Sequence, residues 1–571
     1  GAPDSWTPTT TPPGADSWTP TATSPGRGKV RGRAKASPGV QVYRSTWQGL
    51  EVEVAIWVDA ERDVEFRQVQ LRNTQSRPRP VEVTSNVEVV LNHSAAHRAH
   101  PAFSKLFVQS LWLDRLRALV FRRRPRSAEE RWPLLAHAVI EERPTQWESD
   151  RAKFLGRGHD ALLPRALTVR ESLSGTTGSV LDPTAALRQT VELAPGGVER
   201  VTFVLAVGET QVALESALEA LAGDGTVEKS RAGARRCAQQ QQRASQLSPA
   251  EALRVEELAV ALQYGCGWSS GPRPKATGAR EETAEIAPPS SAPLLVWKTR
   301  LPLREAVPMA ERAVRLWRSR GFPGSIAVAA RRAVHWVFSD GIAVRKKALG
   351  KLDLPSLDVW ETAAHCVVEG DALSLGAAPP RREVRERYRA RAHHEPIGLE
   401  RSALTDWNGW GGFDRQSGAY VMRLEGRSLP PMPWVNVIAN PRVGCLVSER
   451  GAAHTWGMNS REDRLTPWSN DPIVDPFGEA VYLRDERERV FWSPLPGLGA
   501  QPCVVSHAPG SSSWRSVCNE LEQRVSIFVP PTEPLKVTLV ELRNLSCQGR
   551  ELSLWWYAHL VCGALPEQTR R

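Results

Sequence analysis

Residues 43–58 read YRSTWQGLEVEVAIWV, and residues 514–529 read WRSVCNELEQRVSIFV. The two stretches start at positions 43 and 514, a separation of 471 residues, and both open with an aromatic residue followed by Arg-Ser. In each stretch a leucine is followed four, six and eight positions later by valine or isoleucine. This period of two is typical of a β-strand with one buried face. We therefore expect each stretch to form a strand that packs against a core.

The similarity continues in the same register without a gap. The string Leu-Arg-Asn occupies residues 71–73 and again residues 542–544, and Val81 falls on Leu552. Chance does not keep alternating core positions and short polar strings aligned over about forty residues, so the chain contains two copies of one β unit. The first copy starts near the N-terminus at a point that the second reaches only near residue 571. We expect the later part of one sandwich and the earlier part of another, as in a segment of a longer tandem protein.

Two further alternating runs flank a turn signal in the first copy. Leu187, Val191 and Leu193 lead through Pro-Gly-Gly at 195–197 to a second run at 201–207. This pattern predicts a β-hairpin. Together with the repeat it predicts a mainly β fold, with two related, incomplete antiparallel β-sandwich domains joined by a partly helical linker.

The patterning divides the chain into four regions. Residues 1–40 repeat the string DSWTPT among prolines and glycines, and we expect a disordered lead-in there. Residues 41–247 are predicted to form the later part of the first β-sandwich. Residues 248–403 are predicted as a helical and irregular linker, and residues 404–571 as the earlier part of the second β-sandwich.

The linker opens with a helix start signal. The string Ser-Pro-Ala-Glu at 248–251 combines a capping hydroxyl, a proline at the first helical position and a glutamate that can reach back to the cap, which predicts a helix to about Tyr264. A second amphipathic helix is expected at 303–320. Residues 268–293 have the composition of a loop, and residues 325–400 have weak patterning to which we assign no fold.

Charge and cysteine usage narrow the class of protein. Lys and Arg number 74 and Asp and Glu 63, a formal net charge of +11, but the basic runs at 27–35 and 122–126 belong to no nucleic-acid-binding module. We expect no nucleic-acid partner. No uncharged apolar run of about 18 residues occurs, so we expect no direct membrane span. The eight cysteines form no C-x-x-C pair, which favours reduced thiols in the cytoplasm; we expect no metal or other cofactor.

The longest motif of the second copy is PWVNVIANP at residues 433–441. The ordered motifs after it are LVSE (446–449), NSRE (459–462), RLTPWSNDP (464–472), GEAVYLRD (478–485) and WSP (492–494). Those of the first copy are HPAFSKLFVQ (100–109), DRAKFLGRG (150–158) and GSVLDP (178–183). Together they resemble the glycosyltransferase family 36 region of cyclic β-1,2-glucan synthase-like proteins. That region shares its supersandwich with the cellobiose- and chitobiose-type phosphorylases of glycoside hydrolase family 94.

The resemblance implies a particular architecture and chemistry. In that family a large β-sandwich precedes an (α/α)6 barrel, whose aspartic acid protonates the glycosidic oxygen while phosphate attacks the anomeric carbon. Such a reaction needs one catalytic carboxylate, because the nucleophile is external. The chain stops at Arg571 before a barrel, so we expect no catalytic residues in it and the barrel of the parent enzyme as a partner. The resemblance also implies a parent enzyme attached to the inner membrane.

Tryptophan is unusually frequent, with 21 Trp against 12 Phe and 6 Tyr. An indole face suits stacking on a pyranose ring beside polar groups that bind its hydroxyls, although for any single Trp, including Trp456, a place in the sandwich core is favoured. The predicted binding residues for a β-glucan oligosaccharide are Trp434, Asn436, Asn459, Arg461, Arg464, Trp468, Asn470 and Asp471. The predicted function is a sandwich that orients β-glucan. The alternatives are a purely structural spacer between catalytic modules and an active glycosyltransferase or phosphorylase.

Two groups of carboxylates require a choice between catalysis and structure. Asp-Trp-Asn at 406–408 resembles the acid motif of the phosphorylases, but its context DWNGWGGF favours a turn. Asp471 and Asp475 are either a carboxylate pair or loop anchors, and the surrounding prolines and glycines favour anchors.

Two other motifs carry a weaker signal. His93, His97 and His100 have the spacing of metal ligands only on a helix, and their flanks predict a strand followed by a loop. Gly-Arg-Gly at 156–158 lacks the strand-to-helix frame that a nucleotide-binding loop requires.

Overall fold

The structure is a computed structural model. It describes residues 31–264 and 294–320 throughout, residues 397–566 apart from 427 and 500, and separate stretches between 322 and 395. The chain divides into two compact units. The first consists of residues up to 240 except 94–102 and 155–164, and the second of these two short segments together with residues from 241 onward.

The sequence predicted a disordered lead-in at residues 1–40. Its first thirty residues, 1–30, lie outside the described residues. Over Arg31–Ser37 the prediction is wrong, because these residues form strand β1 and pair with β2 (Val40–Trp47). A tight turn through Gly39, whose φ is +77°, returns the chain into this ladder.

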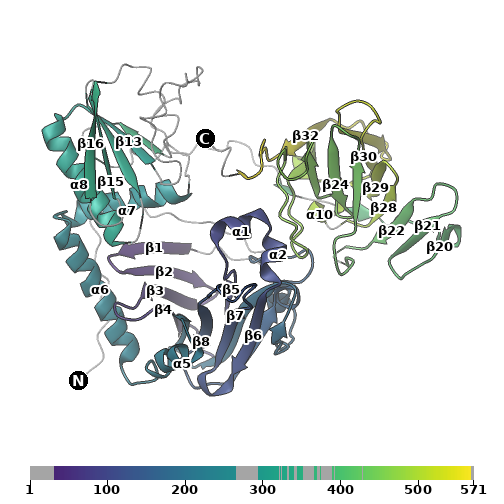
Figure 1. Cartoon of the computed structure of the whole chain (residues 1–571). Coiled ribbons are helices and arrows are strands. Elements are labelled where there is room, and N and C mark those ends of the chain that lie inside the picture. Colours follow the sequence, from purple (N-terminus) through teal and green to yellow (C-terminus); the bar gives the residue numbers. More distant parts are fainter. Residues whose placement is uncertain are drawn as a thin grey trace. The chain divides into compact units, whose positions relative to one another are not determined.

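The first β-sandwich contains two antiparallel sheets (Figure 1). The larger has the order β1-β2-β3-β4-β12-β8-β7-β6-β10 and the smaller the order β5-β11-β9. The strands after β2 are β3 (Leu50–Val58), β4 (Val64–Asn73), β5 (Arg79–Glu88), β6 (Val108–Leu113), β7 (Ala118–Arg123), β8 (Leu134–Val139), β9 (Thr145–Asp150), β10 (Gly178–Ser179), β11 (Pro183–Leu193) and β12 (Val198–Gly208). The helices are α1 (Ser94–Ala99), α2 (Pro101–Lys105), α3 (Arg151–Leu155), α4 (Arg165–Thr168), α5 (Gln211–Glu219) and α6 (Thr226–Ala244), with the 3-10 turn η1 (Asp114–Leu116).

Two apolar layers lie on the two faces of the larger sheet. One fills the space between the sheets and includes Leu71, Leu187 and Phe203. The other includes Phe66 and Leu214, and it packs α5 and α6 against the outer face of the sheet (Figure 1). Both faces are buried because β4 directs alternate side chains into alternate layers.

The predicted hairpin at 187–207 is wrong in one respect. Both strands exist, but β11 pairs with β5 and β9, whereas β12 pairs with β4 and β8. The turn at 194–197 therefore carries the chain from one sheet to the facing one. We call two strands joined in this way a β-arch. A Pro-Gly-Gly turn signal specifies the reversal but not whether the flanking strands pair with each other.

Residues 249–369 form a helix-and-sheet region within the second unit. The elements are α7 (Pro249–Tyr264), β13 (Leu294–Thr299), α8 (Leu303–Ser319), β14 (Ser325–Ala330), β15 (Ala333–Ser339), β16 (Val344–Lys351) and β17 (Cys366–Glu369). Both predicted helices are confirmed. Ser248 and Glu251 form the predicted capping box: the Ser248 amide donates to a Glu251 carboxylate oxygen at 2.8 Å and the Glu251 amide to the Ser248 hydroxyl at 3.3 Å.

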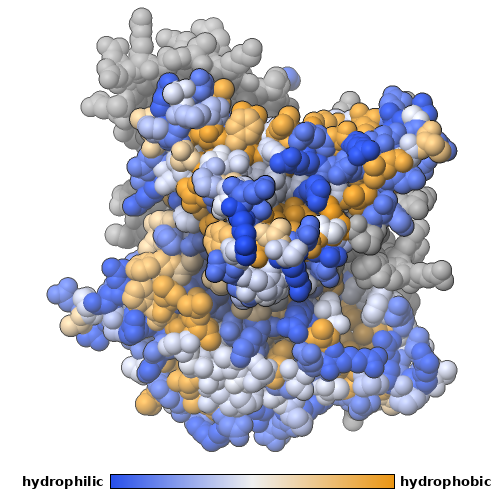
Figure 2. All heavy atoms as spheres, turned by 90° about the vertical axis from the view of Figure 1, so that its right-hand side faces the viewer, coloured by the Kyte–Doolittle hydropathy of each residue, from blue (hydrophilic) through white to orange (hydrophobic). Residues whose placement is uncertain are grey.

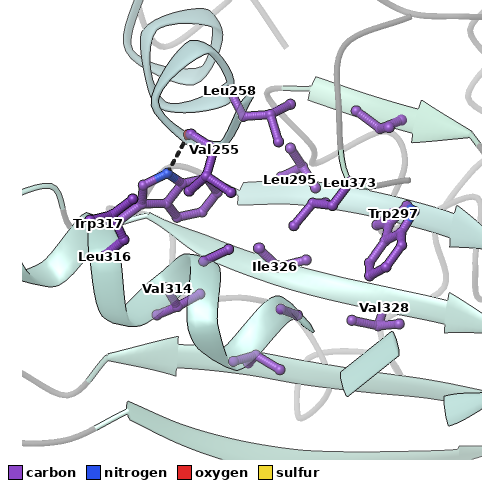
Figure 3. Packing of buried hydrophobic residues seen from close by; sticks show 14 of the residues in the cluster. Val255, Leu258, Leu295, Trp297, Val314, Leu316, Trp317, Ile326, Val328 and Leu373 are labelled. Atoms are coloured by element: carbon purple, nitrogen blue, oxygen red, sulfur yellow. Dashed lines mark hydrogen bonds between the residues drawn. The ribbon is translucent and has the colours of Figure 1, made fainter. Parts of the chain in front are cut away.

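The sequence did not predict the sheet of this region, which has the order β16-β15-β14-β13-β17. Leu295 and Ile326 face α7 and α8, where the Trp317 indole N–H donates to the Val255 carbonyl oxygen at 2.7 Å (Figure 3). Leu294 and Val296 face a second apolar cluster on the opposite side. Strands buried on both faces are continuously apolar, so the period of two is absent.

The second β-sandwich contains three sheets, with the orders β20-β21-β22-β28-β29-β30-β31, β18-β27-β26-β32 and β23-β24-β25. The strands are β18 (Arg389–Ala390), β19 (His394–Glu395, beside β29), β20 (Leu404–Thr405), β21 (Gly411–Asp414), β22 (Tyr420–Leu424), β23 (Val435–Ala439), β24 (Gly444–Ser448), β25 (Ala453–Trp456), β26 (Glu479–Asp485), β27 (Val490–Trp492), β28 (Cys503–Ala508), β29 (Ser511–Cys518), β30 (Leu521–Phe528), β31 (Val537–Asn544) and β32 (Leu552–Ala558). A 3-10 turn, η3 (Arg401–Ala403), and a short helix, α10 (Pro496–Gly499), complete it.

The sequence repeat is also a structural repeat. Leu50 pairs with Asn73 between β3 and β4, and Leu521 pairs with Asn544 between β30 and β31. The β1–β2 and β28–β29 ladders correspond in the same way, and the residue pairs that both copies form are displaced by the same 471 positions. The structure thus confirms a mainly β fold built on a duplicated antiparallel scaffold. Within the described ranges, no helix is long and apolar enough to cross a bilayer.

Candidate functional site

An aromatic column lies beside the loop that follows β25. The Trp468 ring stacks on the His454 ring, with centroids 5.9 Å apart and planes 13° apart, and the His100 ring meets Trp468 edge-on at 6.3 Å. The Trp456 ring centroid lies 5.4 Å from that of His454, with the planes tilted by 34°. Trp456 and Trp468 are each half-buried, so part of each indole faces solvent. This is the arrangement in which an indole can stack on a sugar ring.

The base of the column is neutral and fixed. His454 is buried, its Nδ1 lies 2.7 Å from the Thr466 carbonyl oxygen, and burial lowers the pKa of its imidazole. An uncharged imidazole under Trp468 holds the indole in place without placing a charge beneath it.

The loop that carries Trp468 also carries exposed polar side chains. Asn459 is exposed, and its side-chain oxygen accepts from the amides of Arg461 at 2.9 Å and Glu462 at 3.1 Å. Arg461 is exposed and pairs with Glu462 at 3.3 Å, and Asn470 is exposed with a φ of +50°. The structure therefore brings Asn459, Arg461 and Asn470 onto the surface of the loop that carries Trp468.

Arg464 and Asp471 belong to the same loop but support it from within. Arg464 is 7% exposed, and burial lowers the pKa of its guanidinium. Asp471 accepts from the amides of Ile473 at 2.9 Å and Val474 at 3.0 Å, which closes a turn. These positions suit a role in holding the loop rather than in contacting a ligand.

Trp434 and Asn436 serve the sandwich. The Trp434 ring packs on Tyr420 with centroids 5.5 Å apart and borders the apolar core. The Asn436 amide donates to the carbonyl oxygens of Ala508 at 2.8 Å and Ser511 at 3.0 Å, fastening β23 to the β28–β29 turn. Their contacts fit the alternative explanation from the sequence, in which such residues are structural.

A buried ion cluster, which the sequence analysis missed, fixes the end of the loop. An Arg157 guanidinium nitrogen lies 2.6 Å from a Glu449 carboxylate oxygen and 3.6 Å from Asp475. The Ser448 hydroxyl also donates to Asp475 at 2.7 Å. Burial raises the pKa of Glu449 to about 7, against the opposing effect of Arg157. Asp475 is thus a loop anchor, as the context of this aspartate indicated.

The same cluster explains the Gly-Arg-Gly motif. The Gly158 amide donates to the Ile473 carbonyl oxygen at 2.8 Å, and its φ is +77°. A Cβ at this glycine would lie 2.7 Å from the Leu429 side chain, so only glycine fits. A cavity of about 290 Å³ beside it is lined by Arg157, His159, Asp160 and Arg450, among others. The motif therefore anchors a loop and shows none of the geometry of a nucleotide site.

Three first-copy motifs meet at a second buried ion cluster. Asp182, from GSVLDP, pairs with Lys105 at 2.6 Å and with Arg151 at 2.8 Å. Lys105 belongs to HPAFSKLFVQ and Arg151 to DRAKFLGRG, and all three side chains are less than a tenth exposed. The motifs that carry the resemblance therefore include charges that stabilise one another inside the first sandwich. The pairing of these three charges is seen only in the tertiary structure, because the motifs are far apart in the sequence.

The remaining candidates have structural roles. The Asn408 side-chain oxygen accepts from the amides of Trp410 and Gly411 and from the Tyr420 hydroxyl, so Asp-Trp-Asn at 406–408 forms a turn as its context favoured. The loop expected around His97 is instead helix α1, with arginine and alanine side chains suited to a helix. In the part of the chain that the structure describes, no group of three or more His, Cys, Asp or Glu residues is placed to hold a metal ion.

The fold defines a class of protein: a duplicated antiparallel β-sandwich scaffold. The family model described as "Glycosyl hydrolase 94, supersandwich domain" matches residues 13–223 and 418–571, more than half of the chain. The chain belongs to this family.

Individual relatives agree with the family. The chain is 28% identical over 567 residues to the cyclic beta-(1,2)-glucan synthase NdvB of Rhizobium meliloti (strain 1021), which covers 90% of this chain and 20% of that protein. It is 27% identical over 157 residues to the N,N'-diacetylchitobiose phosphorylase of Vibrio furnissii, covering 26% of this chain and 19% of that enzyme. A solved heparan sulfate lyase, HepC from Pedobacter heparinus, aligns over 32% of this chain and 22% of its own with 9% identity and a TM-score of 0.18, too low to support an argument. The chain thus spans about a fifth of the length of the two curated relatives.

Proposed function

We propose that this chain is a noncatalytic β-glucan-orienting sandwich of a β-1,2-glucan synthase or phosphorylase-type enzyme. Trp468, with Trp456 beside it, would stack on a glucose ring, and Asn459, Arg461 and Asn470 would bind its hydroxyls. The catalytic barrel of the parent enzyme would be the partner that receives the glucan. The observation that supports the proposal is a half-buried Trp468 that contacts two histidine rings and lies on a loop with exposed polar side chains.

The thiols are consistent with a cytoplasmic location for this part of the enzyme. Among the cysteines whose side chains the structure describes, Cys237, Cys445, Cys503, Cys518, Cys547 and Cys562 are free thiols. Burial raises the pKa of Cys445 to about 11, so this thiol is unreactive. We include the cytoplasmic location in the proposal because free thiols persist in a reducing compartment.

A fluorescence titration tests the proposal. The purified chain is titrated with β-1,2-glucan oligosaccharides while its Trp emission is followed. We expect a saturable change that Trp468→Ala weakens by about tenfold or more, a free energy of about 1.4 kcal/mol. Trp434→Phe, which alters a sandwich Trp, serves as the matched control and should leave the affinity unchanged.

The two alternatives give different results in the same experiment. A structural spacer would show no saturable change at any oligosaccharide length. An active enzyme would release glucose 1-phosphate from the oligosaccharide when phosphate is added to this chain alone. Either result would overturn the proposal.

A further inference from the structure

The proposed glucan surface does not involve the basic run at 122–126. Residues 122–132 read RRRPRSAEERW and contain five arginines and two glutamates, a formal net charge of +3. The stretch begins at the end of β7 and forms the loop that leads to β8. Positive charge concentrated on one loop attracts anions.

The Phe107 ring gathers three of these arginines. The guanidinium carbons of Arg123, Arg124 and Arg126 lie 5.0, 5.6 and 5.7 Å from its centroid. A cation over an aromatic ring is attracted by the negative face of the ring, which offsets part of the repulsion between the three cations. We call Arg123, Arg124 and Arg126 the arginine cluster.

The arginine cluster lacks counter-ions within the described part of the chain, because none of its guanidinium groups forms an ion pair there. Glu130 lies on the same loop, but its carboxylate accepts from the backbone amide of Arg126 at 2.7 Å. By contrast, the buried guanidinium of Arg151 is paired with Asp182 at 2.8 Å. The cluster therefore presents positive charge that a ligand can neutralise.

Arg123 is the recessed member of the cluster, at 6% exposed. Its guanidinium carbon lies 5.0 Å from the Phe107 ring centroid and 5.2 Å from that of Trp132. One terminal nitrogen donates to the Ser104 carbonyl oxygen at 2.7 Å, whereas Nε has no hydrogen-bond acceptor among the described residues. Burial lowers the pKa of this guanidinium, against the opposing effect of Glu130. A buried cation without a counter-ion is costly, so an anion placed beside it is stabilised.

Exposed apolar side chains adjoin the cluster. The Phe103 ring meets Phe107 edge-on with centroids 5.3 Å apart and is 47% exposed, and Leu106, which precedes Phe107, is 45% exposed. Arg124 and Arg126 are exposed as well. Figure 2 shows that strongly hydrophilic and apolar residues adjoin one another on the face of the molecule that it presents. Arginine beside aromatic side chains is the combination enriched in protein–protein interfaces.

The rings of this surface do not suit a nucleic acid. Phe107 already holds three guanidinium groups, and Trp132 contacts both Arg123 and the His93 ring, whose centroid lies 4.9 Å away. Single strands bind largely by stacking their bases on aromatic rings, and these rings are occupied. A polypeptide supplies what the surface lacks, because it carries carboxylates on flexible side chains together with apolar groups.

We propose that the arginine cluster, with Phe103 and Leu106 beside it, binds an acidic segment of a partner protein in which Glu or Asp residues flank large apolar ones. Carboxylates of the segment accept from the exposed guanidinium groups of Arg124 and Arg126, whose planar fork matches a carboxylate. A further carboxylate supplies the negative charge that Arg123 lacks, and the apolar residues pack on the exposed apolar side chains. This inference is independent of the proposed glucan surface.

The test uses the full chain and a labelled synthetic peptide of sequence EEFEEL, whose fluorescence anisotropy reports binding. We expect saturable binding that weakens as the salt concentration rises from about 50 to about 300 mM, because salt screens the charges. The peptide QQFQQL, which keeps the shape but has no carboxylates, should bind at least about tenfold more weakly. The peptide EESEES, which keeps the charge but has no apolar residues, should bind at least about threefold more weakly.

Charge-reversal variants separate this site from the general positive charge of the chain. The double variant Arg124→Glu and Arg126→Glu changes two exposed side chains, so the fold should be kept. We expect it to lower the affinity for EEFEEL by at least about tenfold. The matched control, Arg77→Glu with Arg415→Glu, makes the same change in net charge at exposed arginines outside the cluster. It should lower the affinity by less than about twofold.

A third variant tests the apolar part of the surface. Leu106→Ser removes an exposed apolar side chain beside Phe107. We expect it to lower the affinity for EEFEEL by about threefold and to leave the affinity for EESEES unchanged.

Three outcomes would overturn the inference. The first is no saturable binding of EEFEEL. The second is an equal loss of affinity in the cluster variant and the matched control, which would mean that only net charge attracts the peptide. The third is tighter binding to phosphatidylglycerol vesicles or to a single-stranded oligonucleotide than to the peptide, abolished in the cluster variant, which would make a lipid surface or a nucleic acid the occupant. Glucan binding to the Trp468 surface, whether present or absent, affects none of these readings.

Discussion

The two copies of the scaffold share their ladders but not their surroundings. Tyr43 and Trp514 occupy the same position in β2 and β29, yet Tyr43 is 46% exposed and Trp514 is 1% exposed. Trp514 is covered by the core that β23 and β24 complete, and its indole N–H donates to the Glu449 carbonyl at 2.8 Å. The reverse holds at the other edge, where Leu71 is buried and Leu542 is exposed. The repeat thus encodes strand pairing, whereas burial depends on which neighbouring strands each copy has.

A second difference concerns a turn. Gln48 and Gly49 join β2 to β3 with φ values of +47° and +74°, and Asn519 and Glu520 join β29 to β30 with +52° and +57°. A Cβ at Gly49 would lie 2.5 Å from the Gln75 side chain. The residue that corresponds to Gln75 in the second copy is the smaller Ser546. The second copy can therefore accommodate a glutamate, although in a strained backbone conformation.

The largest expected effect comes from the Tyr43 and Trp514 pair. Trp514→Ala leaves a cavity and an unpaired Glu449 carbonyl, and we expect it to lower the free energy of unfolding by about 3–5 kcal/mol. Tyr43→Ala should cost less than about 1 kcal/mol. Urea denaturation followed by far-UV circular dichroism measures both. Equal costs would contradict the difference in burial.

The stability of the second copy should depend on pH through the buried carboxyl group of Glu449. The pKa of Glu449 is raised from 4.5 in the unfolded chain to about 7 in the folded one, so the folded state holds the proton over that range. Its contribution to stability is complete below pH 4.5 and is lost as the pH rises to 7. We expect Glu449→Gln to remove about 2–3 kcal/mol of this pH dependence, measured as the free energy of unfolding between pH 4.5 and 7.5.

The control for this experiment is Glu462→Gln on the exposed loop, which should leave the pH profile of the parent chain unchanged. A Glu449→Gln variant whose stability falls with pH as steeply as that of the parent chain would show that another group holds the proton.

The pair Asn73 and Asn544 should sharpen the comparison between β4 and β31. Asn73 is fully buried with three carbonyl partners, and Asn73→Ala should cost about 2 kcal/mol because those carbonyls lose their donor. Asn544→Ala should cost less than about 1 kcal/mol in the isolated chain, since the residue is exposed. Both follow from denaturant midpoints. An equal cost at Asn544 would contradict the difference in burial between the two asparagines.

Substitutions in the two equivalent turns, at Gly49 and Glu520, should change the free energy of unfolding least. Glu520→Gly relieves a positive φ and should raise the free energy of unfolding by about 0.5–1 kcal/mol. Gly49→Ala introduces both strain and a clash with Gln75, and should lower it by more than about 1 kcal/mol. Thermal unfolding of the two variants should shift in opposite directions. If Glu520→Gly lowers the free energy of unfolding, the glutamate side chain makes a contact that stabilises the fold by more than the backbone strain destabilises it.

The sequence predicted the features that depend on local pattern. The period of two predicted β3 and β30, the offset of 471 predicted their identical pairing, and the cap at Ser248 predicted α7. It predicted a hairpin where the structure has a β-arch, because a turn signal at 195–197 carries no information about the sheet to which each strand belongs. It missed the sheet of β13 and β14, whose strands are apolar on both faces.

The candidate site was predictable only in part. The loop residues Asn459, Arg461 and Trp468 are close in sequence, so the motifs that contain them indicated one surface. Arg157 and Glu449 are 292 positions apart, and nothing in either neighbourhood indicates that they meet. Asp182 and its cations likewise come from three separate motifs. Long-range ion pairs depend on the tertiary fold, which a single sequence does not specify residue by residue.

Hydrogen exchange on the native chain tests the central claim most directly. The claim is that β4 and β31 occupy one position in a repeated scaffold and that, among the described strands, β4 is paired on both edges and β31 on one. We predict that the β3 and β30 amides are protected alike, whereas about half of the β31 amides exchange at least about a hundredfold faster than their β4 counterparts. Equal protection along β4 and β31 would contradict the account.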